Sequence, residues 1–461
     1  MSALTFVDDP GDARPLHLVS KEHLSIWLAR QGDTTRAWLE GAGFRAAAGE
    51  VVLIPGADGR VVAAAGGLGD AKDRLRKRFV AAGLRAKLPE GVWRFETELE
   101  GDALDEAALG WLLAGYAFGR YAKAAPPKAM LVAPKAVQAT RLEQIAKGEA
   151  LARDLINTPA SDMGPDELEA AARSLAEDHG AEISVVKGDA LLEEGFPMIH
   201  AVGRASPRAP RLIDMRWGSS GPTLTVVGKG VCFDTGGLNL KPGASMGLMK
   251  KDMGGAANVL GLAHMLMASR TAIRLRVLIP AVENSVSGAA FRPGDILPSR
   301  KGLTVEINNT DAEGRLVLGD ALALADESKP DLIVSMATLT GAARVAVGPD
   351  LAPFYTDDDR DAAALEAGAR SVRDPVWRLP FWEPYETMIE PGIADLDNAP
   401  KGGFAGSITA ALFLRRFVTD TARYMHFDIY GWTPNAGPGR PKGGTGQGIR
   451  ALFDALPGML G

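Results

Sequence analysis

The chain has 461 residues, of which 46% are hydrophobic, and its 51 Lys and Arg against 57 Asp and Glu give a formal net charge of −6. This length allows two or three domains, and the near-average apolar and charged fractions exclude a disordered, collagen-like or coiled-coil protein. The negative charge gives no long-range attraction for nucleic acid or an anionic membrane, so neither partner is expected. The single cysteine, Cys232, excludes an intrachain disulfide and a Cys-based zinc cage.

The start of the chain has no signal-peptide character, because Asp8 and Asp9 stand where a basic patch and an apolar run would be needed. No run of about 18 uncharged apolar residues occurs anywhere in the sequence. Together with the low cysteine content, these observations predict a cytoplasmic protein that does not span a membrane.

Residues 1–130 alternate apolar strand-like runs with helix-like stretches, which predicts a small α/β domain. The expected strands and helices are Val51–Ile54, Val61–Ala65, Asp70–Ala82 and Asp105–Tyr121. Pro126 and Pro127 then interrupt the helical pattern before a new strand at Ala129–Val132, which places the domain junction between residues 123 and 140. For this first domain we expect a capping or assembly role.

Residues 136–461 predict a larger second domain, with a mixed, mostly parallel sheet flanked by helices. The expected strands are Ala181–Val186, Leu212–Trp217, Leu224–Val227, Leu275–Ile279, Val305–Ile307, Leu332–Ala337 and Met425–Ile429. The expected helices are Leu142–Leu155, Pro165–His179, Gly254–Ala268, Glu313–Asp326 and Ser407–Phe417. The Gly- and Pro-rich residues 434–448 are expected to form an ordered loop or lid. In such sheets ligands bind at the carboxyl ends of the strands.

Charged residues follow the expected strand Leu224–Val227. Lys229, Asp234 and Lys241 lie among apolar and glycine residues, where an unpartnered charge is costly. Surface lysines and a turn aspartate would explain these three residues equally well.

A second acidic residue, Asp252, lies in the segment Met249-Lys-Lys-Asp-Met253, directly before the expected helix Gly254–Ala268. An aspartate at this boundary is an ordinary N-cap candidate. The two methionines suit either a packed core or the wall of an apolar substrate pocket.

The segment Asn308–Leu316 links a strand to a helix and holds Asp311, Glu313 and Arg315 within five positions. Thr310 and Glu313 have the spacing of a capping box, which would explain Glu313 and leave Asp311 unexplained. Two carboxylates that converge at a strand end are typical of a site for a hard cation, and we favour that interpretation.

Four carboxylates in these motifs carry the negative charge that two divalent cations would balance: Asp234, Asp252, Asp311 and Glu313. Two such metal ions can activate a water molecule and polarise a carbonyl or phosphoryl oxygen. Lys241 and Arg315 would then face the substrate as cations suited to stabilising an oxyanion.

A serine hydrolase is the alternative within the enzyme class. The segment Gly243-Ala-Ser-Met-Gly247 matches the nucleophile-elbow pattern around Ser245, and His426 lies downstream in the required order. A nucleophile elbow should directly follow a buried strand, whereas Ser245 follows Lys241-Pro242 in a glycine-rich loop. We therefore favour the metal site.

The motifs V-G-K-G-x-x-F-D-[ST]-G-G, M-K-x-D-M-G-G-A-A and N-T-D-A-E-G-R-L, in this order, resemble those of the leucyl aminopeptidases, also called cytosol aminopeptidases. The resemblance covers about residues 140–461. It implies a cytoplasmic, homohexameric exopeptidase that removes N-terminal residues from peptides with two divalent metal ions, Mn²⁺ or Zn²⁺. A DNA-binding regulatory role, which some such aminopeptidases have, is disfavoured by the net charge and by the acidic run at residues 357–359.

The resemblance also implies the site residues. One metal ion would be held by Lys229, Asp234, Asp252 and Glu313, and the other by Asp234, Asp311 and Glu313. Lys241 would stabilise the oxyanion, and Arg315 would anchor a bicarbonate ion that acts as general base.

The substrate contacts that the resemblance implies are Met249, Asn309, Thr338, Leu339, Gly341, Tyr430 and Trp432. Familiar members of the family carry smaller side chains at the positions of Tyr430 and Trp432. If these two aromatics narrow the first pocket, we expect a graded preference for small or unbranched N-terminal residues in place of leucine. Plain core packing would explain them equally well.

Overall fold

The structure is a computed structural model that describes residues 3–461. The chain forms two compact units, one of which joins the chain up to Ala150 with Asn435–Lys442. The other joins Leu151–Pro434 with Gly443–Gly461. The boundary between the units falls within helix α6 (Ala139–Asn157). No helix among the described residues is long and apolar enough to cross a membrane.

The first unit contains a five-stranded sheet in the order β2-β3-β1-β4-β5, in which only β2 is antiparallel to its neighbour among the described residues. Its strands are β1 (Arg14–Ser20), β2 (Val51–Pro55), β3 (Val61–Gly69), β4 (Gly91–Glu96) and β5 (Ala129–Leu131). Its helices include α1 (Leu24–Ala29), α2 (Asp33–Gly41), α3 (Ala71–Arg76), α4 (Ala82–Arg85) and α5 (Gly101–Leu113). Leu16, Trp93 and Trp111 lie in its core.

Two helices of this unit differ from the sequence prediction. The expected helix Asp70–Ala82 is interrupted, because Lys77 is extended and Phe79 has a left-handed φ of 59°. The expected helix Asp105–Tyr121 instead ends at Leu113, just before Gly115. A Cβ atom at Gly115 would lie 2.0 Å from the carbonyl oxygen of Ala3, so the chain passes close to another backbone segment there.

The second unit is built on a mixed sheet of nine strands within the described residues, in the order β15-β14-β17-β13-β8-β10-β7-β6 with β9 also paired to β10. The strands β17, β13, β8, β10 and β9 are parallel, whereas β6 and β7 are antiparallel to their neighbours. Strand β14 pairs antiparallel with β17 and parallel with β15. The predicted mixed, mostly parallel sheet is therefore confirmed, but the strand expected at Val305–Ile307 is not part of it and pairs instead in a separate small sheet, β11-β12-β16. The strands are β6 (Glu182–Lys187), β7 (Arg211–Trp217), β8 (Thr223–Gly228), β9 (Gly230–Asp234), β10 (Arg274–Asn284), β13 (Leu332–Ala337), β14 (Ala352–Tyr355), β15 (Val376–Arg378) and β17 (Tyr424–Asp428).

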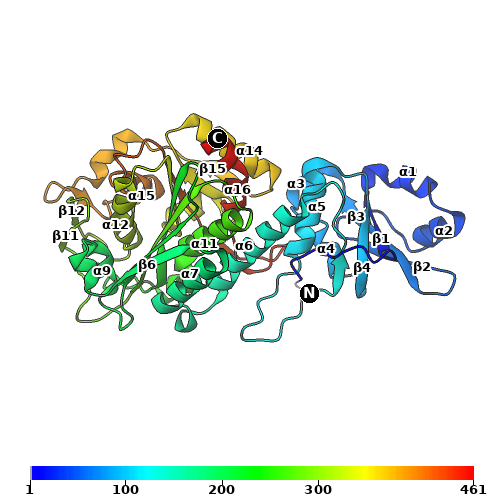
Figure 1. Cartoon of the computed structure of the whole chain (residues 1–461), viewed down its shortest axis with the longest axis horizontal. Helices are drawn as coiled ribbons and strands as arrows, with labels where there is room; N and C mark the ends of the chain where they lie inside the picture. The colour runs from blue at the N-terminus through cyan, green and yellow to red at the C-terminus, as the bar shows by residue number, and fades with distance from the viewer. Residues whose placement is uncertain (1–2) are drawn as a thin grey trace. The chain divides into compact units, whose positions relative to one another are not determined.

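Helices cover both faces of this sheet (Figure 1). One face carries α9 (Pro197–Gly203), α12 (Gly314–Glu327) and α15 (Gly406–Arg415). The other face carries α7 (Pro165–His179), α11 (Gly254–Ala268), α14 (Asp359–Ser371) and α16 (Ile449–Leu460). Short elements complete the unit: α8 (Ala190–Glu193), α10 (Gly243–Met246), α13 (Gly341–Val347), β11 (Ile296–Pro298), β12 (Thr304–Glu306), β16 (Leu396–Asp397), β18 (Trp432–Thr433) and β19 (Gly443–Gly444).

The strand register brings the ends of the parallel strands together. Gly228 at the end of β8 pairs with Met336 of β13, and Ala337 pairs with Asp428 at the end of β17. Asp234 at the end of β9 pairs with Asn284 at the end of β10. The segments that follow these strands therefore meet at one edge of the sheet, where ligands bind in folds of this kind.

Candidate metal centre and active site

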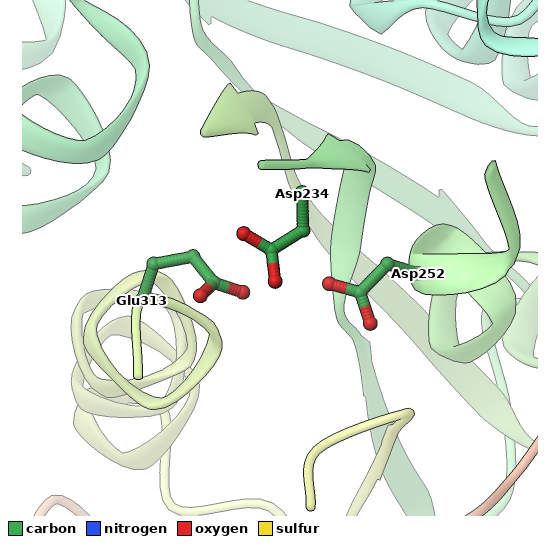
Figure 2. Close-up of side chains that lie close together, drawn as sticks. All are labelled: Asp234, Asp252 and Glu313. Carbon is green, nitrogen blue, oxygen red and sulfur yellow. The ribbon is translucent and has the colours of Figure 1, made fainter. Parts of the chain in front are cut away.

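Three buried carboxylates meet at this edge of the sheet. Asp234, Asp252 and Glu313 each offer an oxygen within 4.8 Å of the others, and they are only 2%, 3% and 1% exposed. Asp234 ends β9, Asp252 lies in a 3-10 helix (Met249–Met253), and Glu313 directly precedes α12. Figure 2 shows their carboxylate groups pointing toward one another. Three negative charges so close in a buried site repel one another unless cations or protons balance them.

Glycines allow the surrounding elements to approach closely enough to form this cluster. A Cβ atom at Gly255, at the start of α11, would lie 2.1 Å from the carbonyl oxygen of Met336. At Gly314, at the start of α12, a Cβ atom would lie 2.4 Å from Cε of Lys229. A side chain at Gly255 would clash with backbone, and one at Gly314 would displace the Lys229 side chain, so glycine at these positions lets the two helices begin directly beside the carboxylates.

Two lysines pair with the acids. The Nζ atom of Lys229 lies 2.6 Å from Oδ2 of Asp252 and 3.0 Å from Oε1 of Glu313. The Nζ atom of Lys241 lies 2.8 Å from Oδ2 of Asp234 and also forms an ion pair with Asp311. Lys229 thus lies within the group of three carboxylates, and Asp311, which is not one of the three, is joined to that group through Lys241.

Burial and mutual repulsion shift the pKa values within the cluster. Burial, together with the neighbouring Asp234, raises the pKa of Glu313, and burial with Asp252 raises that of Asp234. Burial opposes the charge of Lys229, but Asp252 and Glu313 outweigh burial and raise its pKa. The site therefore holds more negative charge than its own lysines neutralise, and additional positive charge would stabilise it.

The donor set fits divalent cations. Carboxylate oxygens are the ligands that hard cations prefer, and the cluster supplies them without histidine or cysteine. Within the described chain, the buried oxygen Oδ1 of Asn284 has no hydrogen-bond partner. Its Nδ2 donates to Oδ1 of Asp234 at 2.8 Å and to the carbonyl oxygen of Thr310 at 3.0 Å.

Sequence reasoning missed Asn284, because the strand predicted at Leu275–Ile279 continues to Asn284 in the structure. The signal was present: the sequence stays apolar through Val282 before it turns polar. A polar side chain at the end of a buried strand is a site candidate for the same reason that Asp234 is.

Arg315 offers a second kind of binding group. Its side chain is 8% exposed, and its Nε and Nη1 atoms have no hydrogen-bond partner in the part of the chain that the structure describes. Burial lowers the pKa of Arg315 to about 10, so the guanidinium is still charged at neutral pH. A buried cation with unused donors fits a small anion.

The expected substrate contacts surround the cluster. Thr338 follows β13, and its Oγ1 donates to Oδ1 of Asp252 at 2.9 Å. The Asn309 Oδ1 atom accepts a hydrogen bond from the backbone N–H of Asp311 at 2.8 Å. These two side chains therefore hold acids of the site in place.

The remaining expected contacts lie on neighbouring segments. Met249 begins the 3-10 helix that carries Asp252, and Gly341 begins α13. The backbone N–H of Leu339 donates to Oδ1 of Asp428 at 3.1 Å. Tyr430 and Trp432 follow β17, and both side chains are half-buried.

Both capping explanations for the acids are wrong. Glu313 is the N-cap residue of α12 but makes no side-chain capping hydrogen bond, and the N-cap of α11 is Met253 rather than Asp252. The Thr310 hydroxyl instead donates to the carbonyl oxygen of Gly236 at 2.6 Å. Tertiary contacts, not local capping, position these side chains.

Ser245 and His426 are not arranged as the serine-hydrolase alternative requires. Ser245 is exposed on α10, whereas His426 is fully buried in β17. Nδ1 of His426 lies 2.8 Å from the hydroxyl of Ser335. Burial lowers the pKa of His426 to about 3, so this histidine is a neutral core group.

Comparison with known proteins agrees with this site. The catalytic domain of the cytosol aminopeptidase family matches residues 150–453, and the N-terminal domain of M17 aminopeptidases matches residues 14–134. The chain belongs to the cytosol aminopeptidase family. A "Probable cytosol aminopeptidase" of Syntrophotalea carbinolica is 41% identical over 366 residues, which cover 75% of this chain and 73% of that relative.

Solved structures show the same family relationship. Cytosol aminopeptidase from Coxiella burnetii is 41% identical, with a TM-score of 0.94 over 99% of this chain and 100% of that one. The bottromycin maturation enzyme BotP in complex with Mn is 31% identical, with a TM-score of 0.87 over 98% of this chain and 100% of that one. The resemblance seen in the sequence is confirmed, and this member of the cytosol aminopeptidase family is a metallo-aminopeptidase that acts on peptides. Neither the serine-hydrolase nor the DNA-binding alternative finds support.

Proposed function

We propose that this aminopeptidase removes the N-terminal residue of peptides at the carboxylate cluster, with two divalent cations. Lys229, Asp234, Asp252 and Glu313 would hold one cation, and Asp234, Asp311 and Glu313 the other. The observation that carries the proposal is the set of three carboxylates whose oxygens lie within 4.8 Å of one another in a buried site. When bound, such cations supply Lewis acidity and lower the pKa of water.

The chain's own residues prepare the reaction. Lys229 can ligate a cation only as the neutral amine. When its ammonium loses a proton, its ion pairs with Asp252 and Glu313 would be lost, and its Nζ atom would be free to ligate the metal ion. Lys241 stays charged, because burial opposes its charge but Asp234 and Glu313 raise its pKa. Its ammonium is therefore suited to stabilising negative charge that develops on the carbonyl oxygen of the peptide bond.

Arg315 is proposed to anchor a bicarbonate ion. Its two unused donors and its burial support an anion at this place. A bicarbonate held there would accept a proton as a general base, a role that no unpaired histidine or carboxylate in the cluster fills.

For the metal we propose Mn²⁺ or Zn²⁺. The carboxylate-rich donor set suits manganese, and the related enzyme BotP is described in complex with Mn. We further propose that the protein acts in the cytoplasm, that residues 1–130 form a capping or assembly domain, and that residues 136–461 form the catalytic domain.

The test is hydrolysis of a panel of aminoacyl anilides by the full chain, before and after chelation. We expect activity to disappear with the chelator and to return with added Mn²⁺ or Zn²⁺, because the buried acids cannot function without cations. Serine-directed inhibitors and Ser245→Ala should leave turnover unchanged. Normal hydrolysis by the metal-stripped protein, with loss of turnover in Ser245→Ala, would contradict the proposal.

A further inference from the structure

Two cationic side chains flank one aromatic ring beside the carboxylate cluster. Nζ of Lys251 lies 4.9 Å from the ring centroid of Tyr430, and Cζ of Arg344 lies 5.0 Å from the same centroid. Lys251 directly precedes Asp252, and Arg344 lies in α13, which follows Thr338 by three residues. The two cations therefore come from elements that border the active site.

Lys251 is buried without a partner of opposite charge. Its side chain is only 6% exposed, yet within residues 3–461 its ammonium makes no hydrogen bond and no ion pair. Arg344 is exposed, and its guanidinium has no such partner among these residues either. A buried ammonium that contacts an aromatic face but makes no hydrogen bond or ion pair is costly, because cation–π attraction replaces just part of its lost hydration.

The acids whose charges attract Lys251 form hydrogen bonds and ion pairs with other groups. Asp252 and Asp428 are the two carboxylates whose charge acts on it. Asp252 pairs with Lys229 and accepts from Thr338. Asp428 accepts from the backbone N–H groups of Leu339 and Thr340 and from two hydroxyls, those of Thr340 and Ser407. Neither acid supplies a free oxygen to Lys251 or Arg344.

We propose that Lys251 and Arg344 form a cationic pocket that selects peptides whose N-terminal residue is Asp or Glu. The inference rests on the proposed aminopeptidase activity at the neighbouring cluster and names the substrate class of that site. The side-chain carboxylate of a substrate bound there would form an ion pair with both Lys251 and Arg344, which have no such partner among the described residues. The amide of Asn or Gln has the same shape but lacks the charge, so it would leave the cations unpaired.

The sharpest test compares substrates that differ in charge and not in size. We expect the metal-loaded enzyme to hydrolyse glutamyl anilide with a kcat/KM at least about tenfold above that for glutaminyl anilide at low salt, and the ratio to fall as salt is added. Arg344→Ala should lower the ratio several-fold, and Arg344→Glu should reverse it. The matched control is Arg370→Ala, which removes an exposed arginine from α14 and should keep the wild-type ratio.

Lys251→Met gives a second, independent readout. Because it removes a buried charge that lacks a partner, it should lower the Glu/Gln ratio without lowering the melting temperature. A marked loss of thermal stability would contradict the absence of a structural partner for Lys251.

The inference is overturned if the wild-type enzyme hydrolyses the two anilides equally well. It is also overturned if charge matters only at the second residue, so that Ala-Glu and Ala-Gln peptides are distinguished while the two anilides are not. Failure of the proposed function has a different outcome, since then alanyl anilide also remains intact with Mn²⁺ or Zn²⁺ present.

Discussion

Two interpretations of Glu313, as a helix cap and as a metal ligand, can be distinguished by its contacts. Its carboxylate lies 3.0 Å from Lys229 and belongs to the buried cluster, and it makes no capping hydrogen bond to α12. A glutamate that only capped a helix would contribute at most about 1 kcal/mol to stability and nothing to turnover. The geometry therefore predicts a large effect on kcat when the charge alone is removed.

We expect Glu313→Gln to lower kcat for anilide hydrolysis by about three orders of magnitude, because loss of a metal ligand removes the activated nucleophile rather than a binding contact. Asp311→Ala should have an effect of the same size. The control is Glu327→Gln in the same helix, where an exposed ion pair with Arg300 is lost and kcat should not change. Normal turnover by Glu313→Gln would exclude Glu313 as a ligand.

Asp326, also in α12, illustrates a carboxylate with a purely structural role. It accepts hydrogen bonds from the backbone N–H groups of Thr419, Asp420 and Thr421 and from Lys301. Burial alone would raise its pKa, but these donors outweigh burial and lower the pKa to about 2. Because the pKa of Asp326 is lower in the folded than in the unfolded protein, its charge stabilises the fold above pH 4. This contribution to the free energy of unfolding is lost as the pH falls through about 2.

We therefore expect Asp326→Asn to lower the free energy of unfolding by about 2 kcal/mol at pH 7. The difference from wild type should shrink as the pH falls from about 4 toward 2, and denaturant unfolding at several pH values measures it. Asp420→Asn, which removes an exposed charge nearby, should have a small effect at every pH. A difference for Asp326→Asn that does not depend on pH would show that its charge is not what stabilises the loop.

At the scale of elements, the short hairpin of β18 and β19 determines where Trp432 lies. Trp432 pairs with Gly444, and a Cβ atom at Gly444 would lie 2.6 Å from Cβ of Ile156, so the hairpin packs closely on α6. Nζ of Lys250 lies 5.6 Å from the Trp432 ring centroid and donates to the carbonyl oxygen of Asn157 at 2.6 Å. Both aromatics that follow β17 thus face cationic side chains from the 3-10 helix of the active site.

If Trp432 narrows the first pocket, Trp432→Ala should raise kcat/KM for phenylalanyl and tryptophyl anilides by about tenfold relative to alanyl anilide. This size follows because one or two methylenes are worth about 1–3 kcal/mol in an apolar pocket. Trp382→Ala, at a half-exposed tryptophan of the same unit, is the control. Unchanged selectivity together with a lower melting temperature would make Trp432 a core residue instead.

At the scale of the whole molecule, large apolar side chains remain exposed on the single chain. Phe404 is 88% exposed, Val345 81% and Ile393 69%. Exposed apolar side chains of this size often mark a surface that another chain covers. The homohexamer that the resemblance implies stays a prediction, to which these exposed side chains add no direct evidence.

We expect light scattering at micromolar concentration to give the mass of six chains. Salt should weaken the assembly little, because apolar contacts are not screened. A monomeric mass would overturn the hexamer while leaving the chemistry of the metal centre untouched.

Several elements could be predicted from the sequence because their determinants are local. The ranges of α7, α11 and β13 match the structure residue for residue, since Pro165 starts one helix, glycines start another and an unbroken apolar run defines the strand. The carboxylates were also predictable, because Asp234, Asp252, Asp311 and Glu313 lie in three short motifs that resemble those of the family. Strands β1 and β4 were missed, because Arg14, Pro15, His17 and Arg94 interrupt their apolar pattern.

The sequence by itself therefore determined the family, the α/β architecture and the acidic donor set, all of which reside in short contiguous motifs. Only the tertiary structure decided which explanation of each residue holds. Thr310 caps nothing because its hydroxyl bonds to Gly236, 74 residues away, and Asn284 joins Asp234 across 50 residues. Lys251, Arg344 and Tyr430 come together from three separate segments of the chain. The physical reason is the same in each case: hydrogen bonds and charges act over a few ångströms in space, and the fold alone sets which distant residues come that close.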